Sequence, residues 1–227
     1  MEKTYIVIAA YNEENNITKV ICSLKKEGYH NIIVVDDGSK DQTSKVAKSA
    51  GAITLKHIIN RGQGAALQTG MSYALLNNAD YIVHFDADGQ HNPKEIKYML
   101  DPIIKKEVDA TLGSRFLKKQ KIPFFRKLML KGGILAILIF YRIKLSDAHN
   151  GFRALSNSAA KKIVIKSDRM EHASEIVEQI NSKKIKYKEI PVTIKYTKET
   201  LKNGRKGQGS FDSIKILSKM VLKKVGV

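Results

Sequence analysis

Two carboxylates one residue apart stand at the end of an apolar run. Residues 84–91 read HFDADGQH and follow YIV at 81–83, so Asp86 and Asp88 come where a buried strand should end. Side chains two positions apart on a strand point the same way, and two carboxylates at one spot repel each other unless a cation lies between them. Hard cations such as Mg²⁺ and Mn²⁺ prefer oxygen ligands. The pattern predicts a metal site of Asp86 and Asp88, with Gln90 as a candidate third ligand; the alternative is an aspartate-rich turn that caps the next helix.

Three more polar clusters follow apolar runs in the first half of the chain. They are YNEE at 11–14, DDGS at 36–39 and NRG at 60–62. Open α/β sheets bind their ligands at the carboxyl ends of the strands. The four clusters therefore predict one binding rim, which carries both acidic and amide side chains.

The elements that must position these clusters alternate between strands and helices. Apolar runs predict strands at 5–10, 31–35, 52–58 and 110–115, and a further strand in YIVHFDAD at 81–88. Helical spacing predicts helices over about 17–27, from Ser39 or Asp41 to Gly51, over 65–76 and from Pro93 onward. Such alternation predicts an α/β fold with a mainly parallel sheet and helices on both faces. No GxGxxG follows the first strand and no GxxxxGK[ST] is present, which argues against dinucleotide and P-loop sites.

Composition limits the class of protein. The chain has 227 residues, of which 43% are hydrophobic, enough for a real core. The single cysteine, Cys22, excludes an internal disulfide, and its apolar neighbours predict that it is buried. The N-terminal residues show no signal-peptide pattern, and the longest apolar run, at 132–141, is shorter than the roughly 20 residues of a spanning helix. We expect a cytoplasmic protein.

Charge divides the chain into two unlike parts. Residues 1–115 hold 14 Lys and Arg against 14 Asp and Glu, whereas residues 116–227 hold 26 against 8 and account for the whole net charge of +18. A basic half of this kind favours a phosphate partner: nucleic acid, anionic lipid or a phosphorylated substrate. The alternative is a lysine-rich solvated surface. Nucleic acid is disfavoured because the chain lacks RNP-like aromatic motifs.

An ordered series of motifs resembles family 2 glycosyltransferases with the GT-A fold, over roughly residues 4–200. The resemblance is strongest to dolichol-phosphate mannose synthases and bacterial polyprenyl-phosphate glycosyltransferases. The series consists of AAYNEE, VVDDGS, NRGQGAAL, FDADGQH, GSR and NGFR. It implies a GT-A domain over 1–200, with a nucleotide-sugar and metal half (1–115), an acceptor half (116–200) and a basic amphipathic segment at 201–227. It also implies inverting transfer of a sugar from a nucleotide-diphospho-sugar with a divalent metal, rather than the related nucleotidyltransferase chemistry, since YNEENN is no Gly-rich, Arg-containing loop.

The resemblance assigns residues to the donor. Tyr11 is expected to flank the nucleobase, Glu13 and Asp37 to accept hydrogen bonds from the nucleoside, and Asp86 to meet both metal and sugar diphosphate. Asn60 and Arg61 lie where the family contacts the nucleotide, although Arg61 is also consistent with a surface arginine in a Gly-rich turn. The chain departs from the family at Ala10, where proline is common.

Two acids compete for the role of catalytic base. SDAHNGFR at 146–153 resembles the family's D-x-x-x-G-F-R stretch on the acceptor side, which carries over Asp147 and Arg153. MEHASEIVEQI at 170–180 resembles the helix whose acid approaches the reaction centre, which makes Glu175 the second candidate. The sequence does not decide between them.

The choice of acceptor bears on the need for a base. A sugar hydroxyl must lose a proton during attack, whereas a polyprenyl phosphate with a second pKa of about 6 is already largely dianionic at neutral pH. The candidate phosphate-binding cations are Arg115, Arg126, Lys127, Lys131, Arg205 and Lys206. The apolar stretch 132–141 and residues 211–225 predict contact with an anionic membrane surface; the alternative for both is ordinary packing against the sheet. We expect transfer from a UDP- or GDP-sugar to a polyprenyl phosphate at the cytosolic membrane face; the alternative is a soluble enzyme that extends a glycan on a hydroxyl.

Overall fold

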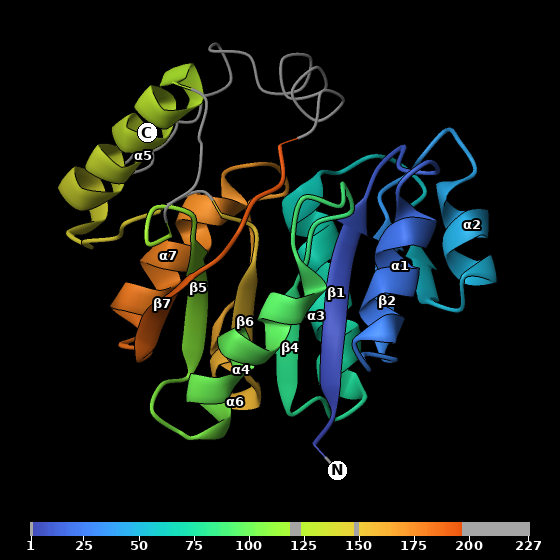
Figure 1. Ribbon diagram of the computed structural model, residues 1–227, viewed down its shortest axis with the longest axis horizontal. Helices are drawn as coiled ribbons and strands as arrows, with labels where there is room; N and C mark the ends of the chain where they lie inside the picture. Colours follow the sequence, from blue (N-terminus) through green and yellow to red (C-terminus); the bar gives the residue numbers. More distant parts are fainter. Residues whose placement is uncertain (1, 119–123, 148–149, 197–227) are drawn as a thin grey trace.

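The computed structural model describes residues 2–118, 124–147 and 150–196 (Figure 1). Within these ranges the strands form one seven-stranded sheet in the order β3-β2-β1-β4-β6-β5-β7. The strands are β1 (Thr4–Ala10), β2 (Ile32–Asp36), β3 (Ile53–Lys56), β4 (Tyr81–His84), β5 (Ala110–Ser114), β6 (Arg153–Ser156) and β7 (Tyr187–Pro191). All neighbouring strands pair in parallel except β6, which is antiparallel to β4 and β5. The predicted mainly parallel α/β sheet is confirmed.

Helices cover both faces of the sheet. They are α1 (Ile17–Lys26), α2 (Thr43–Ser49), α3 (Gln63–Leu76), the short 3₁₀ helix η1 (Pro93–Glu95), α4 (Ile96–Ile104), α5 (Phe124–Tyr141), α6 (Asn157–Lys162) and α7 (His172–Ser182). Alternate residues of β1 enter different cores: Val7 packs with α3, α6 and α7, and Ile8 packs with α1, α2 and α4. The middle of β1 and most of β2 (Ile6–Ala10 and Ile32–Val35) are continuously apolar, as expected for strands buried on both sides.

Helix α3 lies close against the sheet because of a glycine. A Cβ atom at Gly70 would collide with the side chain of Val7 in β1. The close approach fixes the beginning of α3 at the carboxyl ends of the strands, where the binding rim is predicted.

Cys22 is a correction to the sequence analysis. It is exposed on α1 rather than buried. Ile17, Val20, Ile21 and Leu24 form the buried face of this helix, and residue 22 falls outside that stripe. Apolar neighbours in sequence therefore did not indicate burial.

The predicted basic amphipathic segment at 201–227, with Arg205 and Lys206, lies outside the described residues. Arg126 belongs to α5, but its side chain is not described.

Candidate active site

The four polar clusters lie on one rim, at the upper edge of the sheet in Figure 1, because β1, β2, β3 and β4 all run parallel. The loops after β1 and β2 are joined directly. Asn12 receives a hydrogen bond at Oδ1 from the Lys40 amide (2.9 Å), and its own amide donates to Ser39 Oγ (2.9 Å). Next to this junction Tyr11 is 43% exposed, so its ring is available to a planar ligand.

Glu13 brings a third acid close to Asp86 and Asp88. Its Oε2 accepts a hydrogen bond from Asn16 Nδ2 (2.9 Å), and its amide donates to Thr43 Oγ1 (2.8 Å). Burial raises the pKa of Glu13, and the charges of Asp88 and Asp86 raise it further. Glu13 therefore lies within electrostatic reach of both aspartates.

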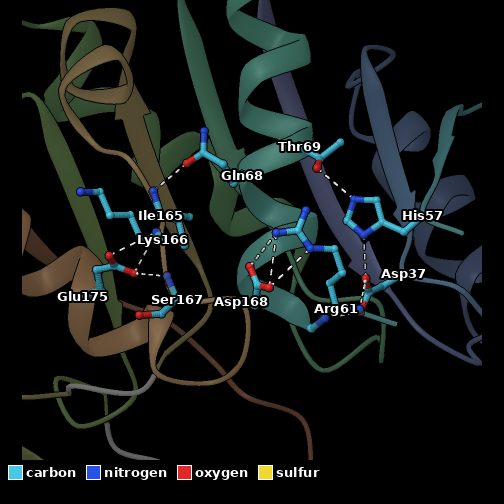
Figure 2. A network of polar contacts seen from close by, with 11 residues as sticks. Asp37, His57, Arg61, Gln68, Thr69, Ile165, Lys166, Ser167, Asp168 and Glu175 are labelled. Carbon is cyan, nitrogen blue, oxygen red and sulfur yellow. Dashed lines mark hydrogen bonds and ion pairs between the residues drawn. The ribbon is translucent and has the colours of Figure 1, made fainter. Parts of the chain in front are cut away.

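Asp37 organises the loop that carries Asn60 and Arg61. Its carboxylate accepts hydrogen bonds from the Arg61 amide (3.0 Å) and the Gly62 amide (2.6 Å), and it contacts His57 Nδ1 (2.7 Å). His57 Nε2 in turn contacts Thr69 Oγ1 of α3 (2.9 Å; Figure 2). The buried Asp37 carboxylate thus ties the end of β2 to the start of α3.

Asn60 and Arg61 have different surroundings in that loop. The backbone of Asn60 packs on Gly38, where a Cβ atom would lie 2.7 Å from the Asn60 amide nitrogen and φ is +71°. Arg61 extends outward, and its Nη2 lies 3.0 Å from Asp168 Oδ1 (Figure 2). The two side chains of this ion pair are 53% and 45% exposed. The Arg61 guanidinium therefore points toward Asp168 and remains about half exposed to solvent.

Asp86 is held by groups that the sequence analysis did not single out. His91 Nε2 lies 2.8 Å from its Oδ2, and Gln63 Nε2 donates to its Oδ1 at 3.3 Å. Its carboxylate also packs on the backbone of Gly151, where a Cβ atom would lie 2.5 Å from Oδ1. Burial alone raises the pKa of Asp86, but its interaction with His91 and the positive charge of Arg153 outweigh burial and lower the pKa to about 2. In the sequence, the only sign of the His91–Asp86 contact is the histidine that ends HFDADGQH.

The strand argument for Asp86 and Asp88 does not apply. β4 ends at His84, and residues 87–88 form a turn, so side-chain alternation does not direct either aspartate. Asp88 instead accepts hydrogen bonds from the Gln90 amide (3.0 Å) and from Gln90 Nε2 (2.7 Å). The amide nitrogen of Gln90, not its oxygen, faces the carboxylate.

The donor atoms at the turn fit a hard divalent cation. In the described ranges no three His, Cys, Asp or Glu side chains are arranged to hold a metal ion by themselves. Asp86 and Asp88 offer two carboxylates, and Gln90 would offer its oxygen after its amide turns over. Oxygen donors suit Mg²⁺ or Mn²⁺, which commonly fill their remaining positions with water and phosphate oxygens.

A buried basic cluster lies behind Asp86. Arg153 and His84 pair across β6 and β4, and His172 begins α7. Within the described chain, Arg153 Nη1 and both ring nitrogens of His84 lack a hydrogen-bond partner. Burial lowers the pKa of Arg153 to about 10, that of His84 to about 3 and that of His172 to about 4. Both histidines are therefore neutral at physiological pH, and Arg153 supplies the charge opposite Asp86.

Asp147 is bound to a buried arginine. Its Oδ2 accepts hydrogen bonds from Arg115 Nε (2.6 Å) and from the Arg115 amide (3.1 Å). The two side chains are 0% and 4% exposed. Glu189 fixes the backbone beside the pair by accepting hydrogen bonds from the Ser146 and Asp147 amides (2.9 and 3.2 Å).

Glu175 is also bound to neighbouring donors. Its carboxylate accepts hydrogen bonds from the Lys166 amide (3.1 Å) and the Ser167 amide (2.8 Å; Figure 2). Glu175 is 5% exposed. Both acids offered by the sequence as a base therefore hold other parts of the chain in place.

Helix α5 presents apolar side chains and cations together. It packs on α7, with Leu130 and Ile137 buried. The exposed large apolar residues of the helix are Leu128, Leu135, Leu138 and Ile139, and the exposed cations on it and just after it are Lys127, Lys131, Arg142 and Lys144. From residue 110 to residue 146 the sequence has no acid. None of the helices in the described chain is both long and apolar enough to span a membrane.

Comparison with known proteins gives consistent results. The family model described as "Glycosyl transferase family 2" matches residues 5–164. A UDP-N-acetylglucosamine–dolichyl-phosphate N-acetylglucosaminyltransferase of Methanococcus voltae is 32% identical, over 98% of this chain and 96% of that protein. A dolichol-phosphate mannosyltransferase of Pyrococcus furiosus is 30% identical, over 84% and 56%. Among solved structures, glucosyl-3-phosphoglycerate synthase of Mycobacterium tuberculosis, in complex with Mn²⁺, UDP-glucose and phosphoglyceric acid, superposes with a TM-score of 0.71 at 17% identity, covering 100% of this chain and 80% of that one.

Proposed function

The chain belongs to glycosyl transferase family 2 and is a glycosyltransferase with the GT-A fold, and on that premise we propose that it transfers a sugar from a UDP- or GDP-sugar to a polyprenyl phosphate. The transfer inverts the anomeric centre, uses Mg²⁺ or Mn²⁺, and takes place at the inner face of the cell membrane. The names of the Methanococcus and Pyrococcus relatives support the acceptor class.

The observation that carries the proposal is the engagement of both candidate bases. Asp147 is paired with Arg115, and Glu175 accepts the Lys166 and Ser167 amides. A hydroxyl acceptor needs a base within hydrogen-bond reach of its proton. A phosphate acceptor is already ionised at neutral pH and needs cations to bind it. A site whose acids are occupied by structural partners therefore suits the phosphate better.

The donor would lie along the rim formed by the first four strands. Tyr11 stacks on the base, Glu13 accepts a hydrogen bond from the nucleoside, and the Asp37-supported loop brings Asn60 and Arg61 to the diphosphate. Asp86 and Asp88, with Gln90, would hold a divalent cation, which would supply stabilisation of negative charge on the leaving diphosphate. The positive charge of the buried Arg153 stabilises the Asp86 carboxylate.

Helix α5 would bring the enzyme to its lipid substrate. Its exposed leucines can enter the interfacial region of a bilayer while Lys127, Lys131 and Arg142 meet anionic headgroups. Helix α5 ends at Tyr141, a few residues before Asp147, the partner of Arg115. The proposed membrane contact and the proposed acceptor side therefore lie close together in the sequence. This placement would present a phosphate from the membrane surface to the site.

The test is a transfer assay with paired acceptors. The full chain is incubated with UDP- and GDP-sugars and Mn²⁺, together with a short polyprenyl phosphate or the matching polyprenol, and sugar on lipid is measured. We expect transfer to the phosphate alone, lost on metal chelation. Equal transfer to the polyprenol or to a glycan hydroxyl would instead support the alternative, a soluble enzyme that transfers the sugar to a hydroxyl. Activity that survives both chelation and Asp88→Ala would overturn the metal assignment.

A further inference from the structure

The segment Ile165–Asp168, which joins α6 to α7, is fixed at several points (Figure 2). The Ile165 amide donates to Gln68 Oε1 on α3 (2.6 Å), and the Lys166 and Ser167 amides donate to Glu175 on α7. At its end the Asp168 carbonyl accepts the Ala65 amide of α3 (3.1 Å). The segment is thus a rigid connection between α3 and α7.

Two glycines allow this segment to lie against the start of α3. A Cβ atom at Gly62 would collide with the carbonyl of Asp168, and one at Gly64 would collide with the carbonyl of Ser167. Gly62 also has φ of +125°, a conformation that other residues rarely adopt. Backbone this closely packed presents the Asp168 side chain from a fixed position.

The fixed position serves an ion pair that contributes little to stability. Arg61 Nη2 contacts both carboxylate oxygens of Asp168 (3.0 and 3.3 Å), and both side chains are about half exposed. Exposed ion pairs of this kind are weak because water screens them. What the pair does accomplish is to restrict the orientation of a long, flexible arginine side chain.

Resting on the proposed function, we infer that Asp168 is a positioning residue that holds Arg61 in the orientation in which it meets the donor diphosphate. Glu175 supports Asp168 from the other side by fixing the Lys166 and Ser167 amides. The acid on α7 therefore acts on donor binding through the segment, not on the acceptor proton.

The inference predicts coupling between two substitutions. Asp168→Asn keeps the shape of the side chain and removes its charge, so Arg61 loses its orientation and nucleotide affinity falls about three- to tenfold. In Arg61→Gln the arginine is already lost, so adding Asp168→Asn changes affinity by less than about twofold. The matched control is Asp101→Asn, because the Asp101–Lys105 pair on α4 is equally exposed (54% and 59%) and distant from the rim. It leaves affinity unchanged.

The experiment is calorimetric titration of each full-length variant with UDP and with GDP in the presence of Mn²⁺, alongside thermal unfolding. We expect the Asp168→Asn loss of affinity with Tm within about 3 °C of the wild type for both exposed-pair variants. Unchanged or tighter binding in Asp168→Asn, or losses that add in the double variant, would overturn the positioning role while leaving the donor assignment intact. Wild-type protein that binds neither nucleotide would overturn the donor assignment itself, and the positioning role with it.

Discussion

The proposed donor and acceptor sides of the rim each contain an arginine–aspartate pair, and the two pairs differ in burial. Arg61 and Asp168 on the donor side are about half exposed, whereas Arg115 and Asp147 on the acceptor side are almost wholly buried. An exposed guanidinium that contacts its carboxylate through Nε and Nη2 still has N–H groups with which to donate to a phosphate. A buried pair cannot separate without leaving an uncompensated charge. Burial therefore marks the donor pair as available to ligand and the acceptor pair as part of the frame.

The two ion pairs should differ most in their contribution to the free energy of unfolding. Arg115→Met removes the guanidinium that faces the buried Asp147 carboxylate and should cost about 3–5 kcal/mol of unfolding free energy. Arg61→Met should cost less than about 1 kcal/mol, because its pair is exposed. Chemical denaturation of the two variants measures both values. Similar losses would remove the distinction between the pairs.

A second prediction concerns acid and the buried histidine His172. Its pKa is lowered from 6.5 to about 4 by burial first and Arg153 second, against the opposing charges of Asp86 and Glu175 and a hydrogen bond with the Arg169 carbonyl. Above pH 6.5 the imidazole is neutral in both states, so its contribution is present there. Between pH 6.5 and 4 only the unfolded chain binds the proton, so stability is lost as pH falls, by at most about 3 kcal/mol.

The measurement is urea unfolding across this pH range for the wild type and His172→Asn. His84 titrates in the same direction and remains in both proteins, so the difference between the two isolates His172. Parallel pH profiles would contradict the assignment of His172 as a buried neutral histidine.

The proposed metal ligands give the largest expected effect on catalysis. Asp88→Asn removes one of two carboxylates offered to the cation and should lower transfer about 100-fold. Its Mn²⁺ dependence should move to higher concentration, with Asp101→Asn as the unaffected control. Full activity in Asp88→Asn would exclude this residue from the metal site.

The smallest expected effect is on membrane contact. Leu138→Gln on α5 should weaken binding to anionic vesicles about threefold, since one apolar side chain no longer enters the interface. Leu76→Gln changes a leucine that is more exposed than Leu138 (82% against 44%), at the far end of α3, and should leave binding unchanged. Vesicle sedimentation of both variants measures the difference. An equal loss in both would show that α5 has no special role.

Sequence patterns predicted the architecture well and individual side chains less well. Continuous apolar runs such as Ile32–Val35 indicate strands buried on both faces, and the structure has them there. The direction of Asp86 was argued from strand alternation, yet β4 ends before it, because strand ends depend on pairing partners distant in sequence.

The hydrogen-bond partners of Asp168, Glu175 and Glu189 could not be predicted from the sequence, also because they depend on contacts made in the folded chain. Asp168 lies 107 positions from Arg61, and Glu189 lies more than 40 from Ser146. No local pattern encodes such contacts. Glu175 illustrates the consequence: its place in a family-like helix suggests a base, and only the folded chain shows that its carboxylate accepts the Lys166 and Ser167 amides.

The most direct test of the account is the pH dependence of transfer to polyprenyl phosphate by Glu175→Gln and the wild type. If the acceptor arrives ionised, both proteins should show the same profile, with an acidic limb near the second phosphate pKa of about 6. The variant should then lose donor affinity but keep kcat within about tenfold. A fall in kcat of about a thousandfold, with loss of the acidic limb, would identify Glu175 as the base and contradict the account.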